Sequence, residues 1–398
     1  MKDRKIVFLV EYDKAGEFFF RFAAAIGGHC VFVTALPSVY FKAKLLGYQA
    51  FLTGWRKHGE KLSVSDAELE ATKAVALGAM PIRKARDRAC EVFNAVKSAV
   101  FTDEENKDVY VLTWNGASVS GVAARAIKQH YPETKLLFLE IANLPGKIFV
   151  DPKGVNAQSS LYRDPLLLDL YDLPSDKEFS EWTENYVAEK SKPSYVAPQA
   201  KKQALGAFAL IDFFYSAVFG NNYFGSPVLK IKNYLGYKNE NKVKVDYVKH
   251  SEVGLFAFLP LQVSNDSQIL INSDVDNVDA IRLISSRESC LLVKPHPAER
   301  DTSYLAQAVL GMSNVSVTDE NTFDLIRASS KVYTINSTVG LEALILGKNV
   351  EFLGRSYFSH FNNDRLKRYI FSFLINIDFF SESKISRLDA ENVLSRAA

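Results

Sequence analysis

Residues 5–34 read KIVFLVEYDKAGEFFFRFAAAIGGHCVFVT and set the pattern of the chain. Residues 5–10 and 29–34 are apolar runs of strand length, and the segment between them carries Phe18, Phe22 and Ile26 at helical spacing. Strands that are apolar throughout are typical of parallel sheets, because helices cover both of their faces. This stretch therefore predicts a strand–helix–strand unit of an α/β protein.

The same alternation continues along the chain. The first half adds strands at 108–113 and 135–140, with one or two long helices over 64–100. In the second half we expect strands at 254–259, 290–294, 331–335 and 349–353, helices at 274–287, 301–310, 322–329 and 338–347, and helical pieces over 363–395. The pattern predicts two Rossmann-type domains, 1–250 and 251–398, with the ligand cleft between the carboxyl ends of their sheets.

The middle of the chain is less regular. Residues 166–189 indicate an acidic surface helix, and 190–203 an exposed connector. Residues 208–236 are rich in Phe, Tyr, Leu and Ile, with Lys230, Lys232 and Lys238 beside them. Such a segment can belong to a core, or it can contact a membrane surface.

Composition excludes several classes of protein. The net charge of the 398 residues is +2, which gives no general basic field for nucleic acid. Cys30, Cys90 and Cys290 lack the spacing of metal ligands, so we expect reduced, buried thiols. Reduced thiols favour a cytoplasmic protein, and no apolar run is long enough to span a bilayer. No H-E-x-x-H, P-loop or D-x-D pattern occurs, so the sequence predicts neither a metal nor a cofactor.

Two motifs follow expected strands of the second half and suit an anionic ligand. Lys294-Pro295-His296-Pro297 places a cation and an imidazole on a loop that two prolines stiffen. Asn336-Ser337-Thr338-Val339-Gly340-Leu341-Glu342 joins a strand to a helix, whose N-terminus can bind phosphate. The alternatives are a solvated lysine in a rigid loop and an ordinary helix cap.

Two further polar stretches also follow strands. In residues 260–268, PLQVSNDSQ, Asp266 can act as a nucleophile or a base, and Gln262 and Asn265 can bind sugar hydroxyls. Glu140 ends the strand 135–140 and precedes a polar run over 151–161. A turn and a surface loop are the alternative interpretations.

The order of these four stretches resembles the capsule polysaccharide biosynthesis family of KpsS/KpsC-like β-Kdo transferases. The similarity covers roughly residues 140–360, through NLPGKIFVDPKGVNAQSSL, PLQVSNDSQIL, VKPHPAER, INSTVGLEALILGK and FLGRSYF. It implies a GT-B-like fold that retains the β configuration, uses CMP-Kdo and needs no metal. Residues 165–250 match no segment of the family, which leaves the acceptor open.

The resemblance also implies roles for individual residues. Asp266 would be the nucleophile, Glu140 the acid/base for the acceptor hydroxyl, and burial at its strand end would raise the pKa of Glu140. Lys294 and His296 would hold the phosphate and carboxylate of the donor. Further expected substrate-binding or nucleotide-binding residues are Gln262, Asn265, Ser267, Asn336, Ser337, Thr338, Glu342, Lys153 and Asn156.

The expected partners are a CMP-sugar donor and an oligosaccharide or lipid-linked acceptor, with peripheral contact at the inner membrane as a further option. Three alternatives stay open. The enzyme could transfer another CMP-activated acid, such as a sialic acid. It could be a transferase or epimerase that uses a UDP-sugar. It could also be a non-catalytic module that binds a capsule precursor for export.

Overall fold

The computed structural model describes residues 4–54, 60–101, 108–192, 211–212, 214–215, 245–264, 266–299 and 302–397. The chain forms two compact units. Unit 1 comprises Met1–Ser160, Pro198–Tyr234 and Leu374–Ala398, and unit 2 comprises Leu161–Ala197 and Leu235–Phe373. The single domain boundary expected at residue 250 therefore differs from the division found in the structure.

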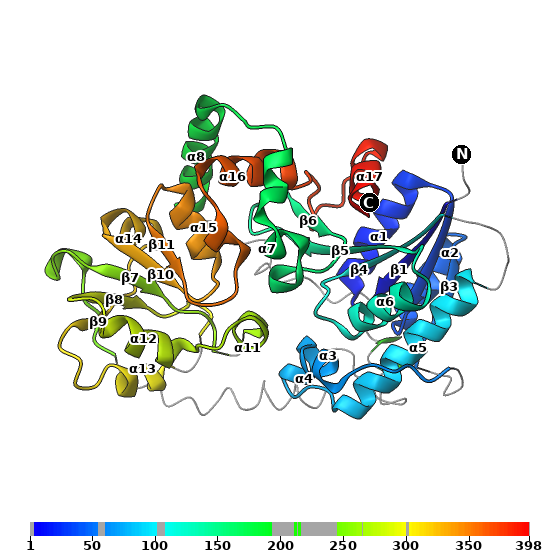
Figure 1. Cartoon of the computed structure of the whole chain (residues 1–398), viewed down its shortest axis with the longest axis horizontal. Coiled ribbons are helices and arrows are strands. Elements are labelled where there is room, and N and C mark those ends of the chain that lie inside the picture. Colours follow the sequence, from blue (N-terminus) through cyan, green and yellow to red (C-terminus); the bar gives the residue numbers. More distant parts are fainter. Residues whose placement is uncertain are drawn as a thin grey trace. The chain divides into compact units, whose positions relative to one another are not determined.

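The sheet of unit 1 has the order β3-β2-β1-β4-β5-β6 (Figure 1). Its strands are β1 (Arg4–Val10), β2 (His29–Thr34), β3 (Gln49–Leu52), β4 (Asp108–Trp114), β5 (Lys135–Ile141) and β6 (Ile148–Asp151). All neighbours are parallel except β6, which runs antiparallel to β5. The strand order reverses direction between β1 and β4, which is where ligands bind in open α/β sheets.

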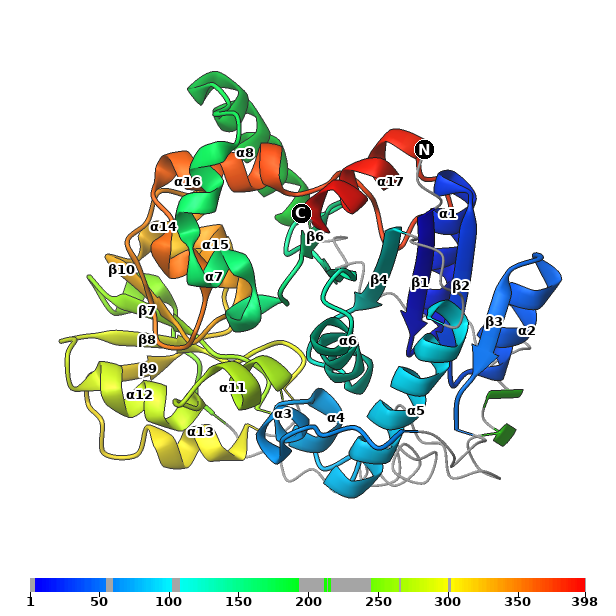
Figure 2. The same cartoon turned by 45° about the vertical axis from the view of Figure 1, so that its right-hand side comes forward.

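Helices cover both faces of this sheet. α1 (Asp13–Ile26), α2 (Pro37–Leu45) and α17 (Arg387–Leu394) share one apolar cluster with alternate strand residues such as Phe8 and Phe32. α5 (Ile82–Val100) and α6 (Val119–His130) pack together and against β1, β2, β4 and β5 (Figure 2). Strands buried on both faces explain the continuous apolar runs in the sequence.

The sheet of unit 2 has the order β11-β10-β7-β8-β9, and all of its strands are parallel. The strands are β7 (Ala257–Pro260), β8 (Leu291–Lys294), β9 (Val315–Val317), β10 (Lys331–Thr334) and β11 (Val350–Phe352). Read from β9, this order repeats that of β3 to β5 in unit 1, with the reversal between β7 and β10. The two Rossmann-type units confirm the expected GT-B-like fold class.

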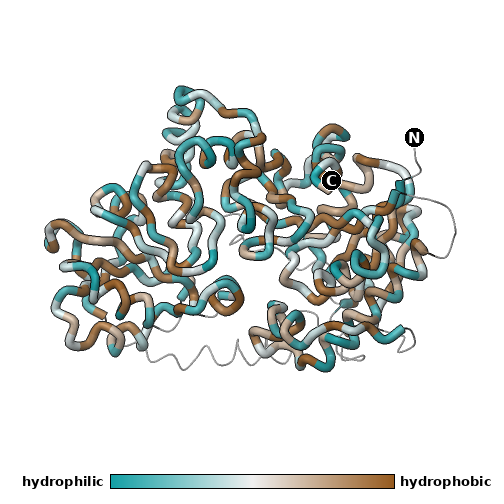
Figure 3. The backbone as a smooth tube through the Cα atoms, viewed as in Figure 1, coloured by the Kyte–Doolittle hydropathy of each residue, from teal (hydrophilic) through white to brown (hydrophobic). Residues whose placement is uncertain are grey.

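Helices also cover both faces of the second sheet. α11 (Ser267–Asn272), α12 (Asn277–Ser285) and α13 (Ser303–Ala308) pack on one face. α14 (Thr322–Ala328) and α15 (Thr338–Ile345) pack on the other. In Figure 3 hydrophobic stretches run through both sheets, and hydrophilic stretches lie on outer helices such as α8 (Asp176–Lys190).

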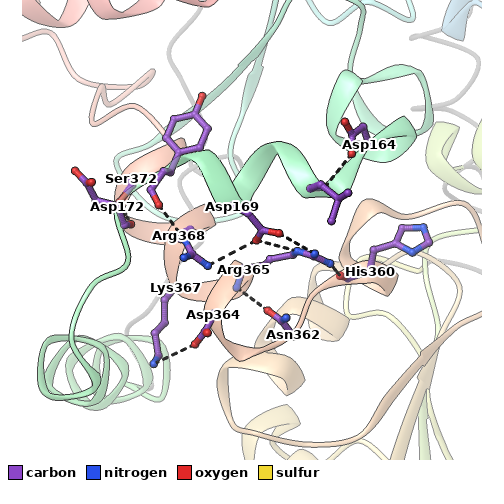
Figure 4. A network of polar contacts seen from close by, with 12 residues as sticks. Asp164, Asp169, Asp172, His360, Asn362, Asp364, Arg365, Lys367, Arg368 and Ser372 are labelled. Atoms are coloured by element: carbon purple, nitrogen blue, oxygen red, sulfur yellow. Dashed lines mark hydrogen bonds and ion pairs between the residues drawn. The ribbon is translucent and has the colours of Figure 1, made fainter.

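A network of charges joins residues 164–176 to α16 (Asn363–Arg368) within unit 2 (Figure 4). Asp169, in the 3-10 helix Pro165–Leu170, accepts hydrogen bonds from Arg365 Nε at 3.1 Å and Nη2 at 2.9 Å. Arg368 donates to the carbonyl of Tyr171 at 2.9 Å, and Lys367 pairs with Asp176. These contacts explain why a segment that precedes residue 250 belongs to unit 2.

The expected helices are shorter than the sequence suggested. The region 64–100 contains α3 (Asp66–Glu70), α4 (Lys73–Ala76) and α5, because Gly78 has a φ of 65° and Pro81 caps α5. The acidic helix expected over 166–189 is a 3-10 helix followed by α8, whose N-terminus has a capping box at Ser175.

Three sequence predictions bear on where in the cell the protein acts: those for the middle segment, the cysteines and membrane-spanning helices. The connector 190–203 and the aromatic segment 208–236 lie almost wholly outside the described residues. All three cysteines are free thiols, but only Cys30 is buried, and the other two are half-buried. In the described part of the chain, no helix combines the length and the apolar character that crossing a bilayer requires.

Candidate functional site

The three motifs of the second half come together at the carboxyl edge of the sheet in unit 2. Pro260 of β7 pairs with Lys294 of β8, so PLQVSND and KPHP leave the sheet side by side. On the other side of β7, the backbone N–H of Asn336 donates to Gln262 Oε1 at 3.0 Å. Gln262 and Asn336 therefore flank the reversal between β7 and β10, the position at which open α/β sheets bind ligands.

Gln262 is a structural link at this edge. Its side chain is buried, its backbone N–H donates to Asn277 Oδ1 at 3.2 Å, and its carbonyl accepts from Asn277 Nδ2 at 2.7 Å. Its Oε1 accepts the hydrogen bond from the backbone N–H of Asn336. Gln262 thus joins the loop after β7 to Asn336 and to α12, and the contact with sugar hydroxyls expected for it stays a prediction.

Asn336 has one polar atom in use and one without a partner. Its Nδ2 donates to the carbonyl of Gln268 at 2.9 Å. Its Oδ1 is buried and accepts no hydrogen bond from the described residues. A buried acceptor without a donor costs free energy, so this atom is suited to accept a hydroxyl or an amino group from a ligand.

The helix α15 starts next to Asn336. Ser337 caps it, because its Oγ accepts from the N–H of Val339 at 3.2 Å, and Thr338 is the first helical residue. A Cβ atom at Gly340 would lie 2.5 Å from the ring of Phe352, so only glycine allows this packing. The close packing holds the start of α15 at the reversal between β7 and β10.

Glu342 lies inside α15 and is engaged within unit 2. Its carboxylate forms an ion pair with Lys190 of α8 and accepts from Tyr186 at 3.5 Å. Both side chains are largely buried, at 7% and 16% exposure for Glu342 and Lys190. Burial lowers the pKa of Lys190, but the neighbouring Glu342 and Tyr186 outweigh that effect and raise it. The substrate-binding or nucleotide-binding role expected for Glu342 stays a prediction.

The Lys294 ammonium group is also partly occupied. Its Nζ donates to the carbonyl of Glu320 and to Thr322 Oγ1, which is 3.0 Å away. Burial lowers the pKa of Lys294, and the nearby carboxylates of Asp319 and Glu320 oppose this shift. The amine thus contacts the loop between β9 and α14 and the first residue of α14.

His296 lies among charged groups of the same edge. Its Nδ1 accepts the backbone N–H of Ala298 at 3.0 Å, so a proton on the ring resides on Nε2. Burial lowers the pKa of His296 below its usual value, and the negative charges of Asp266 and Glu299 only partly offset this shift. His296 therefore lies within electrostatic reach of Asp266, and the roles expected for both residues stay predictions.

Asp266 caps α11. Its Oδ1 accepts from the N–H of Gln268 at 2.9 Å, and its own N–H donates to the carbonyl of Val263 at 2.8 Å. The role of Asp266 as a nucleophile stays a prediction. Asn265 and the side chain of Ser267 lie outside the described residues, so their expected roles stay predictions.

Unit 1 carries the remaining candidates, at the ends of β5 and β6. Glu140 accepts from Asn156 Nδ2, at 3.2 Å to Oε2 and 3.4 Å to Oε1. The N–H of Lys153 donates to Asp151 at 2.8 Å, and the side chain of Lys153 is exposed. Glu140 and Asn156 are thus neighbours, whereas the binding role predicted for Lys153 has no further support.

Glu11 is a residue at the edge of unit 1 that the sequence analysis missed. It follows β1, and the N–H of Ser120 in the first turn of α6 donates to its Oε1 at 2.7 Å. Burial raises the pKa of Glu11, and the hydrogen bonds from Ser120 and Ser118 oppose this shift. The signal was a carboxylate directly after an apolar strand, which is the same signal that drew attention to Glu140.

Comparison with known proteins first identifies a family. The model described as "Capsule polysaccharide biosynthesis protein" matches residues 124–361. Protein FixF of Sinorhizobium fredii is 34% identical over 114 residues, which are 26% of this chain and 27% of FixF. The capsule polysaccharide modification protein LipB of Neisseria meningitidis is 29% identical over 147 residues, which are 33% of this chain and 35% of LipB. The chain thus matches about a third or less of the length of these curated relatives.

Solved structures give more distant similarities. Thermosulfurimonas dismutans KpsC, described as a β-Kdo 2,7 transferase, has a TM-score of 0.42 and 15% identity, over 77% of this chain and 88% of that chain. The UDP-GlcNAc 2-epimerase from Neisseria meningitidis has a TM-score of 0.26 and 9% identity, over 98% of each chain. The fold assignment rests on the sheet order given above.

The family match includes β5, the polar loop with Asn156, and all three motifs at the edge of unit 2. It extends over more than half of the chain. The protein therefore belongs to the capsule polysaccharide biosynthesis protein family.

Proposed function

We propose that this protein is a retaining β-Kdo glycosyltransferase, which moves Kdo from CMP-Kdo to a glycan or glycolipid acceptor of a capsule or related surface polysaccharide. The coarser part, a role in capsule polysaccharide biosynthesis, follows from the family. The finer part is supported by the motif order that resembles β-Kdo transferases. The observation that carries the proposal is the convergence of KPHP, PLQVSND and NSTV at the reversal between β7 and β10.

The donor would bind in unit 2. The phosphate of CMP would lie at the start of α15, because free N–H groups and the helix dipole favour an anion there. Lys294 and His296 would balance the charge of the phosphate and of the Kdo carboxylate. Asn336 Oδ1, which is buried without a hydrogen-bond partner among the described residues, would accept a hydroxyl or amino group of the nucleotide.

Transfer with retention would take two displacements. A carboxylate oxygen of Asp266 attacks the anomeric carbon of Kdo, and the bond to CMP breaks with its electron pair remaining on the phosphate. The acceptor oxygen then attacks the same carbon, the bond to Asp266 breaks, and Glu140 takes the proton of the acceptor hydroxyl. Lys294, His296 and the start of α15 would stabilise the departing phosphate, so this scheme assigns no step to a metal.

Calorimetry with CMP and UDP in the presence of a chelator tests the donor class. We expect CMP to bind and UDP to bind far more weakly. A preference for UDP would reject the Kdo proposal and favour a UDP-sugar enzyme. Binding of neither nucleotide would favour a protein that holds a capsule precursor for export.

Transfer assays then separate the remaining donors. CMP-Kdo and a CMP-sialic acid would be offered with the same acceptors, because Lys294 and His296 suit the carboxylate of either sugar. Transfer of Kdo alone supports the proposal, and transfer of sialic acid alone contradicts it. A cytoplasmic location with contact at the inner membrane is part of the same proposal, and fractionation of cells would test it.

A further inference from the structure

The loop after β6 is organised by one buried carboxylate. Asp151 is 2% exposed and ends β6. Its Oδ1 accepts from the N–H groups of Lys153 at 2.8 Å and Gly154 at 3.1 Å, and from Ser160 Oγ at 3.2 Å. Its Oδ2 accepts from the N–H of Ser160 at 2.9 Å. A buried carboxylate needs such partners, and all four hydrogen bonds tie both ends of the loop 152–160 to β6.

The closed loop presents Asn156 in a fixed orientation. Asn156 has a φ of 52°, in the left-handed region that asparagine tolerates better than most residues. Its carbonyl accepts from Ser159 Oγ at 2.7 Å and from the N–H of Ser159 at 3.1 Å. Gly154 allows the tight path of the loop, because a Cβ there would lie 2.7 Å from Gln158 Cβ.

The side chain of Asn156 meets Glu140. Its Nδ2 lies 3.2 Å and 3.4 Å from the two carboxylate oxygens of Glu140. The amide in the loop therefore donates to the carboxylate on β5. A donor on a carboxylate fixes its orientation and favours its charged form. A charged, oriented carboxylate is the form that accepts a proton.

We infer that Asp151 and Asn156 are positioning residues for Glu140. Asp151 closes the loop, the loop holds Asn156, and Asn156 holds the carboxylate ready to take the acceptor proton. This inference rests on the proposed function, and it changes the role expected for Asn156 from binding substrate to orienting the base. All the hydrogen bonds that connect Asp151, Asn156 and Glu140 lie within unit 1.

Three variants test the inference through the pH profile of Kdo transfer. Asn156→Gly keeps the left-handed backbone without strain and removes the donor. Asn156→Asp keeps the size of the side chain but repels Glu140. Asp151→Asn replaces one acceptor oxygen by an amide that faces the Ser160 N–H. The matched control is Asp164→Asn, because Asp164 accepts from the N–H of Leu166 at 3.1 Å in an exposed cap of unit 2.

We expect kcat to fall about tenfold in Asn156→Gly and about a hundredfold in Asn156→Asp, with the KM for CMP-Kdo little changed. The acidic limb of the pH profile should move to higher pH in both Asn156 variants and in Asp151→Asn. The reason is that the charged carboxylate of Glu140 no longer receives the hydrogen bond from Asn156. The control should keep the wild-type limb. Variants that lower the unfolding midpoint but leave kcat and the limb unchanged would reduce Asp151 and Asn156 to a purely structural role.

A second measurement does not depend on activity. Urea unfolding of Asn156→Gly, Glu140→Gln and the double variant forms a double-mutant cycle. We expect non-additive effects, with the two single changes together costing more than the double change. Additive effects would overturn the contact itself. If the wild-type protein transfers no sugar, the proposed function fails, and the cycle still decides whether Asn156 holds Glu140.

Discussion

The two units have the same strand order at their centres. They differ in the side chain that accepts a hydrogen bond at the start of the helix after the strand-order reversal, α6 in unit 1 and α15 in unit 2. In unit 1, the carboxyl group of Glu11 accepts from the first turn of α6. In unit 2, the residue in the comparable place is Gln262, whose neutral amide accepts from Asn336 just before α15. Helix N-termini attract anions, so unit 1 provides its own acidic group and unit 2 does not. The start of α15 therefore receives no carboxylate from the residue that corresponds to Glu11, which is consistent with the phosphate site proposed there.

The largest expected effect concerns the chemistry of unit 2. Replacement Asp266→Ala should lower kcat for Kdo transfer by a factor of roughly 10²–10⁴, because the nucleophile is lost. CMP binding, measured by calorimetry, should change little. The control is Asp276→Ala, which removes a comparable cap from α12, where Asp276 accepts from Val278 at 2.8 Å. Equal losses in both variants would mean that Asp266 serves only as a cap.

Loss of the ion pair between Lys190 of α8 and Glu342 of α15 should have the next largest effect, on the stability of the protein. Lys190→Met leaves the buried carboxylate of Glu342 without its partner, and removing one member of a buried pair costs about 3–5 kcal/mol of unfolding free energy. Urea unfolding measures the loss. The double variant Lys190→Met/Glu342→Leu should recover part of it, since no lone charge remains. Full stability in the single variant would show that water reaches the pair.

An isosteric exchange tests the comparison directly. Gln262→Glu keeps an acceptor for the Asn336 N–H but adds the acidic group that unit 1 already has. CMP affinity should fall about tenfold, which corresponds to about 1.4 kcal/mol, and the loss should grow from neutral to mildly alkaline pH as the new carboxyl ionises. Unchanged affinity at both pH values would place the phosphate away from α15. Glu11→Gln, the reverse exchange, should leave CMP affinity as it was.

The smallest effect is a change in how stability depends on pH. Burial raises the pKa of Glu11 in the folded protein, so between the unfolded and folded pKa values the folded state binds more protons. The contribution of Glu11 to stability should therefore fall as pH rises through that window. Urea unfolding at several pH values should show this slope in the wild type and a flatter one in Glu11→Gln. A slope of opposite sign in that comparison would mean that α6 stabilises the charged form more than burial opposes it.

Much of the fold was predictable because the central strands are buried on both faces. Strands β1, β2, β4 and β5 each contain a continuous apolar stretch, and their positions agree with the sequence. Strands β3, β6 and β9, which have 4, 4 and 3 residues and lie at sheet edges, were not predicted. The division into units was not predictable, since the ion pair of Asp169 with Arg365 spans 196 positions and leaves no local pattern.

The candidate site was predictable to the extent that each motif directly follows a strand. That rule brought PLQVSND, KPHP and NSTV to one edge before the strand order was known. It did not reveal what the side chains contact. The partner of Glu342 is 152 residues away, and the link between Gln262 and Asn336 depends on the adjacency of β7 and β10. Glu11 was overlooked because a single acidic residue after a strand is a weak signal.

The return of residues 374–397 to unit 1 has a consequence for synthesis on the ribosome. Ile148 and Ile375 are bridged, and residues such as Phe379 and Val393 complete the apolar cluster around α1. The ribosome therefore releases this last part of unit 1 only after the whole of unit 2 has been translated. Unit 2 can reach its final packing while unit 1 still exposes the apolar surface that α17 will cover. In a nascent chain stalled near residue 373, we therefore expect chaperones to bind the exposed apolar surface of unit 1.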